Sequence, residues 1–360
     1  MHASTSSSTP EPAPWAVVLA GGIGSRFWPV STPTHPKQLL RLAGDKPLIR
    51  QTIERIRPLV PAERIRIVAG EHLARSLLEA VPELAADNLM IEPAAKGTAA
   101  ALAWAAWTIH GLDPDAVMIS LHADHVIDPA PAFRELLRAA ARAAGEHGRL
   151  FTIGARPTRP ETGYGYIRPG EALGGTAGRE VDRFVEKPSH DVAETYMREG
   201  FLWNTGIFVW TVDVLLEELE RHTPEIAGAL PLLANGDARL FFERVPTLSI
   251  DHGLLERSTQ VGVIPATFDW DDVGAWDAVS RTRASDDKGN VAVGDSHLVE
   301  SSDCIAWAEE GSVVLFGAHD LVVIRANGIT FVAPRGRTPE LKSLLERLPA
   351  RLREPGPRES

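Results

Sequence analysis

The chain has 360 residues, of which 44% are hydrophobic and 24% charged, and its formal net charge is −11. This composition is that of an ordinary globular protein with one or two domains, and it excludes a largely disordered or fibrous chain. The negative charge argues against nucleic acid as a partner bound through bulk electrostatics, and a single cysteine, Cys304, excludes an internal disulfide.

The first fourteen residues, MHASTSSSTPEPAP, are rich in Ser, Thr and Pro. They have neither the basic start nor the apolar stretch of a signal peptide, so we expect a disordered segment over residues 1–14. No apolar run in the sequence approaches the roughly 18 residues needed to cross a bilayer. We therefore expect a cytoplasmic protein with no membrane partner.

From Trp15 onward, short apolar runs typical of strands alternate with longer runs typical of helices. The expected pairs are Ala16–Ala20 with Leu48–Val60, Ile65–Ala69 with His72–Val81, Leu89–Ile91 with Thr98–His110, and Val117–Leu121 with Ala132–His147. This alternation predicts an α/β fold with a Rossmann-like, mostly parallel sheet flanked by helices. Ligands of such sheets bind beyond the carboxyl ends of the strands, which makes the loops after Ala20, Ile91 and Leu121 candidates for the site.

After Leu150 the pattern changes to glycine-punctuated strands and further helices. The expected strands are Gly163–Arg168, Val181–Val185 and Gly206–Trp210, and the expected helices are Val192–Glu199 and Val212–Arg221. These extend the first domain, which we place at residues 15–286. Short Val- and Ile-rich runs from Lys288 to Arg335 predict a small β-rich domain over 287–360, which ends in a helix at Thr338–Leu348.

The loop after the first strand combines small residues with cations. Its small residues are Ala20, Gly21, Gly22, Gly24 and Ser25. Glycine permits a positive φ and lets backbone amides approach an anion, which indicates a phosphate cradle. A tight turn is the alternative, but Arg26 and Lys37 in the same proline-stiffened loop suit a polyphosphate better. The dinucleotide pattern G-x-G-x-x-G fails at Phe27 and the P-loop pattern is absent, so both of those classes lose weight.

Carboxylates stand at two further points. Asp124 lies just beyond the fourth strand and is a ligand of the type that Mg²⁺ prefers, although a helix N-cap is the alternative. Asp272 lies in the segment Phe268–Trp276, whose acidic cluster would by itself indicate a solvated turn. His122 and His125 flank Asp124, and we favour support of this turn over metal ligation as their role.

The run from Leu19 to Pro29, followed by Pro36-Lys37-Gln38, resembles the signature of the sugar-nucleotide pyrophosphorylases. Phe27-Trp28-Pro29 and Pro36-Lys37-Gln38 are similar to the variants found in bacterial mannose-1-phosphate guanylyltransferases. The resemblance covers roughly Trp15 to Arg283 and implies a GT-A-like nucleotidyltransferase fold. For the C-terminal domain it implies a partial left-handed β-helix used in dimer contacts, and therefore a homodimer.

The resemblance also implies roles for individual residues. Arg26 and Lys37 would bind the triphosphate, and Asp124 and Asp272 would hold Mg²⁺. The expected catalytic residues are Arg26, Lys37, Asp124 and Lys187. Beyond the glycine loop, the expected nucleotide contacts are Glu92, Pro93 and Thr98. The expected sugar-phosphate contacts are Gly163, Tyr164, Glu186, Lys187, Asn204 and Thr205. Near the base, Lys96, Gly97 and Ala100 replace the Arg, Asn and Pro of the family.

The implied reaction joins GTP to α-D-mannose 1-phosphate, giving GDP-mannose and pyrophosphate by in-line attack on the α-phosphate with Mg²⁺. A phosphate monoester is already mostly dianionic at pH 7, so no general base is required. Other sugar 1-phosphates or nucleotides, such as heptose or glucose 1-phosphate and dTTP, are alternatives within the class. A catalytically silent regulatory protein that binds nucleotide sugars is the alternative outside it. The chain lacks the His cluster of the isomerase domain of longer relatives, so no isomerase activity is expected.

Overall fold

A computed structural model of the chain describes residues 13–22 and 24–353. Nearly all of the segment expected to be disordered lies outside these described residues. The centre of the fold is a nine-stranded sheet. In spatial order its strands are β3 (Leu89–Glu92), β2 (Ile65–Gly70), β1 (Trp15–Leu19), β4 (Val117–His122), β9 (Leu202–Thr211), β6 (Leu150–Ala155), β10 (Val261–Pro265), β8 (Arg179–Glu186) and β7 (Gly165–Ala172).

The strand directions confirm the mostly parallel sheet. Strands β3, β2, β1 and β4 are parallel, as are β6 and β10. Strand β9 runs antiparallel between β4 and β6. Two strands of the sheet, β6 and β10, fall outside the elements expected from the sequence, and β9 begins at Leu202 rather than Gly206. Residues 203–205 are therefore part of a strand.

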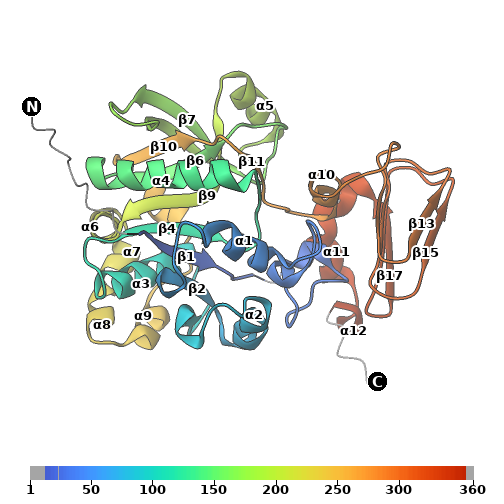
Figure 1. Ribbon diagram of the computed structural model, residues 1–360, viewed down its shortest axis with the longest axis horizontal. Helices are drawn as coiled ribbons and strands as arrows, with labels where there is room; N and C mark the ends of the chain where they lie inside the picture. The colour runs from blue at the N-terminus through green and yellow to red at the C-terminus, as the bar shows by residue number, and fades with distance from the viewer. Residues whose placement is uncertain (1–12, 23, 354–360) are drawn as a thin grey trace, which may run out of the picture.

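Helices cover both faces of the sheet (Figure 1). Alternate residues of β1 explain why both faces are apolar, since Ala16 and Val18 enter one core while Val17 and Leu19 enter the other. The first core packs under α1 (Leu48–Ile56), α2 (Ala74–Ala80) and α4 (Ala130–His147). The second packs under α3 (Thr98–His110), α6 (Val212–His222), α7 (Pro224–Ala227), α8 (Leu230–Ala234) and α9 (Ala238–Arg244).

Helix α3 spans the predicted residues Thr98–His110. Its alanines are buried, which lets the helix approach the sheet closely. Trp104 and Trp107 pack against the same core, and the Trp104 ring contacts Phe242 edge-on at 5.4 Å between centroids. These tryptophans are thus part of the core packing. A further helix in this domain, α5 (His190–Arg198), packs instead on the outer strands β7 and β8 through Tyr196.

A small antiparallel ribbon joins two distant segments at the edge of the sheet. It pairs β5 (Val126–Asp128) with β11 (Asp269–Asp271), and Asp271 lies opposite Val126. The turn that precedes β5 and the turn that follows β11 therefore lie next to each other. This pairing brings Asp124 and Asp272 into one place.

The C-terminal strands form two small sheets in a separate lobe beyond α10 (Val279–Thr282) (Figure 1). One contains β12 (Val291–Val293), β14 (Ile305–Ala308), β16 (Leu321–Ala326) and β17 (Ile329–Pro334), and the other contains β13 (Ser296–Val299) and β15 (Val313–Phe316). All neighbours are parallel except β16 and β17. Such stacking of successive turns is typical of a β-helical coil, and its handedness stays a prediction. Two helices follow, α11 (Leu341–Arg347) and α12 (Ala350–Arg353).

The C-terminal lobe shares its core with the first domain. Phe27, Trp28 and Trp276 belong to the same buried cluster as Trp307 and Phe331 of the lobe. The strands before and after the predicted boundary at residue 286 thus belong to separate sheets, but residues on both sides of this boundary pack in one apolar core. Within the described part of the chain, no helix is long and apolar enough to traverse a membrane.

Candidate active site

The glycine loop and the Pro36-Lys37-Gln38 segment lie in direct contact beyond the end of β1. Gly24 has a φ of 67°, and a Cβ on it would lie 2.3 Å from the Cβ of Lys37, so only glycine fits. The Gln38 side chain donates from Nε2 to the carbonyl of Ala20 at 2.7 Å. These contacts place Lys37 beside the phosphate loop that the sequence predicts.

Lys37 contacts both of the residues that the sequence predicts as metal ligands. Its side chain is buried, with Nζ 2.7 Å from Oδ2 of Asp124. The same ammonium donates to the main-chain carbonyl of Asp272 at 2.5 Å. The structure thus brings Lys37, Asp124 and Asp272 together from three loops that are far apart in sequence.

The two carboxylates differ in their charge environment. Burial by itself would raise the pKa of Asp124, but the charge and hydrogen bond of Lys37, together with the nearby His125 and His122, outweigh burial and lower this pKa to about 2. The pKa of Asp272 is raised, because burial and the nearby carboxylates of Asp271 and Asp124 prevail over Lys37. Burial and the neighbouring carboxylates therefore disfavour the charged form of Asp272, whereas Lys37 and the two histidines favour that of Asp124.

Asp271 and Asp272 point to different partners. The Asp271 carboxylate accepts from Nε of Arg281 at 2.7 Å and from the amide of Val273 at 2.7 Å, which fixes the turn. Asp272 Oδ1 instead accepts a short hydrogen bond from the hydroxyl of Tyr164. Asp271 is thus a structural residue, and Asp272 remains the one that faces Lys37.

Tyr164 is positioned by Arg159, a residue that the sequence does not single out. Arg159 donates from Nη2 to the Tyr164 hydroxyl at 3.1 Å, and its guanidinium lies 5.1 Å from the ring centroid of Trp203. The Tyr164 carbonyl also accepts from the amide of Lys187. The hydroxyl of Tyr164, a residue predicted to contact the sugar phosphate, therefore orients Asp272 in this structure, while the main chain of Tyr164 supports Lys187.

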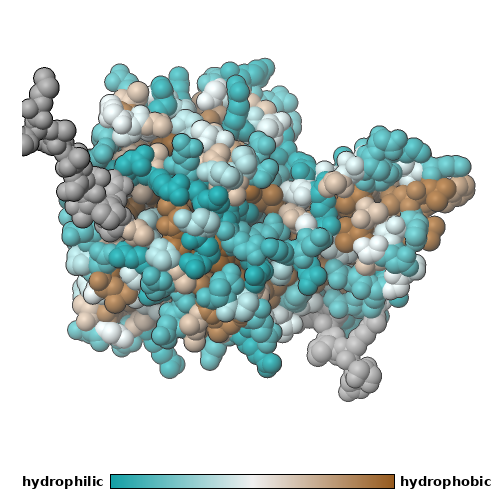
Figure 2. Space-filling model, viewed as in Figure 1, coloured by the Kyte–Doolittle hydropathy of each residue, from teal (hydrophilic) through white to brown (hydrophobic). Residues whose placement is uncertain are grey.

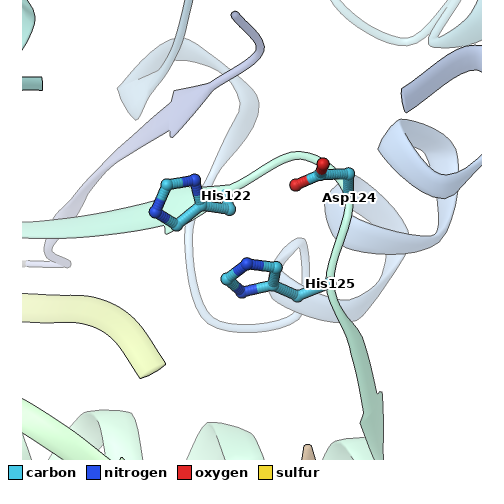
Figure 3. Close-up of side chains that lie close together, drawn as sticks. All are labelled: His122, Asp124 and His125. Atoms are coloured by element: carbon cyan, nitrogen blue, oxygen red, sulfur yellow. The ribbon is translucent and has the colours of Figure 1, made fainter. Parts of the chain in front are cut away.

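His122 and His125 flank Asp124, and the two imidazoles face each other with 4.6 Å between ring centroids (Figure 3). The potential ligand atoms of the three residues lie within 4.8 Å of one another. However, Nδ1 of His125 accepts a hydrogen bond from the Trp270 indole at 3.2 Å. A neutral imidazole that accepts at Nδ1 carries its proton on Nε2 and has no second lone pair for a metal. His125 therefore supports the turn, as the sequence analysis favours.

The predicted sugar-phosphate contacts gather at the ends of β7, β8 and β9. Lys187 has a left-handed backbone with φ of 48°, and its Nζ lies 2.6 Å from Oε1 of Glu186. A Cβ on Gly165 would lie 2.6 Å from Oε2 of Glu186 and 3.3 Å from Cβ of Asn204, so all three residues are neighbours. Glu186, Lys187 and Asn204 therefore form one polar cluster, as the resemblance implies.

Asp251 completes this cluster and was not foreseen from the sequence. The Asn204 amide donates to Oδ1 of Asp251 at 2.7 Å, while Asn204 Oδ1 accepts from Thr152 at 2.8 Å. Burial, reinforced by the Glu186 carboxylate, raises the pKa of Asp251 to about 6. Two carboxylates and an amide at one point form a set of acceptors and a donor suited to sugar hydroxyls.

The remaining predicted residues fall into two groups. Thr205 is buried, and its hydroxyl donates to the carbonyl of Ile153 at 2.7 Å, so this side chain holds the strand. Thr98 Oγ1 accepts from the amide of Ile250, which fixes the segment that carries Asp251. Arg26, Pro93 and Gly163 are exposed. Arg26 lies in the short 3-10 helix Ser25–Phe27 and donates to the Gly274 carbonyl at 3.4 Å.

A pocket of about 250 Å³ lies between the glycine loop and the start of α3. Its lining residues are Leu19, Gly21, Gly22, Val68, Glu92, Ala95, Gly97, Thr98, Ala101 and His122. Burial raises the pKa of Glu92 to about 7, and no hydrogen bond or ion pair to its carboxylate occurs among the described residues. Gly97, with φ of 82°, packs against the Leu248 carbonyl, where a side chain would clash at 2.4 Å. The pocket is thus lined by the backbone of several glycines and by one carboxylate that has no partner among the described residues.

The pocket borders the sugar-side cluster. The ring of His122 lines the pocket and also lies against Gly206, where an added Cβ would come within 2.7 Å of Nε2. Gly206 is two residues beyond Asn204. The pocket and the sugar-side cluster therefore meet beside the Lys37–Asp124–Asp272 centre.

Comparison with known proteins identifies relatives over most of the chain. The nucleotidyl transferase family matches residues 15–288. A mannose-1-phosphate guanylyltransferase of Klebsiella pneumoniae is 36% identical over 346 residues, which cover 92% of this chain and 73% of the relative. The enzyme of the same name from Escherichia coli K12 is 37% identical over 355 residues, which cover 93% of this chain and 73% of that protein.

Solved structures agree with these relatives. A crystal structure from Thermus thermophilus, described as a mannose-1-phosphate geranyltransferase, is 35% identical with a TM-score of 0.85. The match covers 93% of this chain and 99% of that one, so it includes the C-terminal lobe.

Proposed function

Because the chain belongs to the nucleotidyl transferase family, we propose that it is a mannose-1-phosphate guanylyltransferase, which makes GDP-mannose and pyrophosphate from GTP and α-D-mannose 1-phosphate. The observation that carries the proposal is the position of Lys37, Asp124 and Asp272 beside both the Glu92 pocket and the Glu186–Asn204–Asp251 cluster. The identity to enzymes of this name over most of the chain supports the same choice.

The reaction requires two anions to approach each other. An oxygen of mannose 1-phosphate forms a bond to the α-phosphorus of GTP, and the bond from that phosphorus to the α–β bridging oxygen breaks, with its electron pair leaving on pyrophosphate. Lys187 would neutralise the attacking phosphate, while Arg26 and Lys37 would bind the triphosphate. No proton needs to be removed from a dianionic phosphate, so catalysis reduces to positioning and charge compensation.

The donor set fits Mg²⁺. Asp124 and Asp272 offer carboxylate oxygens, which Mg²⁺ prefers. Burial, reinforced by the Asp271 and Asp124 carboxylates, raises the pKa of Asp272, so a cation bound there would stabilise its charged form. Bound there with the help of substrate phosphates, the ion would stabilise charge on the α-phosphate and the leaving group. The short contact of Tyr164 with Asp272 would hold that ligand in place.

Glu92 supports guanine as the base. Guanine presents two adjacent N–H donors, its ring N1–H and its exocyclic amine, to a carboxylate, whereas adenine offers only the amine beside a lone pair. The half-buried carboxylate of Glu92, which has no partner among the described residues, would pair with the first edge and be left unsatisfied by the second. The nucleotide-binding role of Glu92 thus has a physical basis even though Lys96 and Gly97 depart from the family pattern.

The test is pyrophosphate release from GTP, ATP, dTTP and UTP, each paired with mannose, glucose, galactose and fucose 1-phosphates. We expect GTP to exceed ATP by about 10²-fold or more in kcat/KM, because the wrong base leaves buried polar groups unpaired. Preference for mannose over glucose should be smaller, since they differ in one hydroxyl. A highest value for dTTP with glucose 1-phosphate would contradict the guanylyltransferase assignment, and no reaction with any pair would favour a silent regulatory protein.

We also propose a homodimer formed through the C-terminal lobe. Strands β13 and β15 present exposed apolar side chains, Val299, Val314 and Phe316, which are 49%, 66% and 73% exposed. Figure 1 places β13 and β15 at the outer end of the lobe, and Figure 2 shows a hydrophobic area in the same place. A second copy would cover this face. Light scattering of the purified chain should then give about twice the monomer mass, and cell fractionation should place it in the cytoplasm.

A further inference from the structure

The motif Phe27-Trp28-Pro29, which carries part of the family resemblance, faces the C-terminal lobe rather than the candidate site. Phe27 and Trp28 are 0% and 5% exposed. The Trp28 ring meets Phe331 of β17 edge-on at 5.7 Å between centroids. Its indole N–H donates to the carbonyl of Leu352 in α12 at 2.9 Å. This motif therefore cannot read the substrate through its aromatic rings.

The lobe also binds the main chain of the phosphate loop. The Asn327 side chain, in the turn between β16 and β17, donates from Nδ2 to the carbonyl of Pro29 at 2.9 Å. Pro29 is three residues from Arg26. A single side chain of the lobe thus anchors the loop that holds the expected triphosphate ligand.

The loop that carries Asp272 also contacts Phe27 and Trp28. The Trp276 indole N–H donates to the Trp28 carbonyl at 3.0 Å. The Trp276 ring centroid lies 5.3 Å from that of Phe27 and 5.3 Å from that of Trp307 in the lobe. Trp276 follows Asp272 by four residues. The phosphate loop and the Asp272 loop are therefore joined to each other and to the lobe through one aromatic cluster.

We propose that the C-terminal lobe sets the relative position of the phosphate loop and the Asp272 loop, and that Asn327 is a positioning residue for GTP. This proposal rests on the proposed function for the role of GTP but not for the conformational effect. Neither Asn327 nor Phe331 belongs to the candidate binding residues. Their effect passes through the Trp28–Pro29 main chain and the Trp28 ring.

The structure offers a clean variant and a matched control. Asn327 has a left-handed backbone with φ of 52°, so Asn327→Gly removes the amide without backbone strain. Glu300 lies on the same lobe, is exposed, has the same φ of 52°, and its side chain has no partner among the described residues. Glu300→Gly therefore changes the same kind of backbone position without touching the loop. Trp28→Phe gives an independent removal of the second donor while keeping a ring against Phe331.

We expect Asn327→Gly and Trp28→Phe each to raise the KM for GTP about fivefold to tenfold, the effect of one lost hydrogen bond on loop order. The KM for mannose 1-phosphate should stay within about twofold, because the Lys187 cluster is untouched. Amide hydrogen exchange of residues 24–31 should become faster in both variants. Glu300→Gly should match the wild type in both measurements.

An Asn327→Gly protein that behaves like Glu300→Gly in GTP KM and in exchange would overturn the proposal. A rise in both substrate KM values with lower thermal stability would also count against it, because this would be general loosening of the fold. If the wild type transferred no nucleotide, the proposed function would fail, yet the exchange of residues 24–31 would still decide whether the lobe orders the phosphate loop.

Discussion

Replacing Asp124 by asparagine should lower kcat about 10³-fold while the protein stays folded. A carboxylate that holds a catalytic cation contributes several kcal/mol of transition-state stabilisation, and about 4 kcal/mol corresponds to this factor. Asparagine keeps the size and one oxygen acceptor, but it removes the charge that pairs with Lys37 at 2.7 Å. The measurement is steady-state pyrophosphate release over a range of Mg²⁺ concentrations.

Asp269→Asn is the matched control for this prediction. Asp269 lies on the ribbon strand β11 beside the same site, is exposed, and its side chain has no partner among the described residues. Its substitution should leave kcat within about twofold, as is usual for surface positions. Retention of most of the Mg²⁺-dependent activity by Asp124→Asn would show that the metal ligands have been assigned to the wrong residues.

The second large effect is expected from Lys37→Met, which should reduce kcat/KM for GTP by about 10²-fold to 10³-fold. The variant keeps the buried aliphatic stem but removes the ammonium that contacts both Asp124 and the Asp272 carbonyl, so a preorganised cation is lost next to the transferring phosphate.

Lys187→Met should instead raise the KM for mannose 1-phosphate most strongly, since Lys187 lies in the Glu186–Asn204 cluster.

Lys46→Met controls for the loss of a charge as such. Lys46 is an exposed residue whose ammonium pairs with Glu54 on the surface, and such pairs contribute little. Both substrate KM values should be unchanged in this variant. If Lys37→Met and Lys187→Met shifted the two substrates equally, the division of the site into a triphosphate side and a sugar side would be wrong.

The parts of the fold that follow from local pattern could be predicted from the sequence. Helix α3 begins and ends at the predicted residues, and the loops after β1, β3 and β4 do carry the candidate site. These features depend on periodicity over a few residues and on the general rule that ligands lie beyond the carboxyl ends of parallel strands. The glycine loop could be predicted for the same reason, since a position with positive φ, such as Gly24, favours glycine in the sequence.

The parts that depend on long-range contacts could not be predicted. Asp251 contacts Asn204 across 47 positions, and Tyr164 contacts Asp272 across 108, and no local pattern announces either pair. Asp251 follows Ile250, whose amide bonds to Thr98, so its position depends on a segment that the sequence pattern leaves unassigned. The short ribbon of β5 and β11 is likewise too brief to give a periodic signal.

The residues Phe27 and Trp28 carry part of the family resemblance, but they do not contact the candidate substrate site through their rings. Phe27 and Trp28 marked the chain as similar to mannose-1-phosphate guanylyltransferases, yet their rings pack between the phosphate loop and the C-terminal lobe. We propose that selection of the sugar comes instead from the polar groups of Glu186, Asn204 and Asp251, which lie next to one another. A motif thus identifies relatives even where its residues act through packing.

The most direct test of the account uses α-D-mannose 1-phosphate labelled with ¹⁸O in its three non-bridging phosphate oxygens. The labelled compound is incubated with GTP and Mg²⁺, and both products are analysed by mass spectrometry. Attack by a sugar-phosphate oxygen on the α-phosphorus predicts GDP-mannose that keeps all of the label and pyrophosphate that carries none. Label in pyrophosphate, GDP-mannose without label, or no GDP-mannose at all would contradict the proposed reaction.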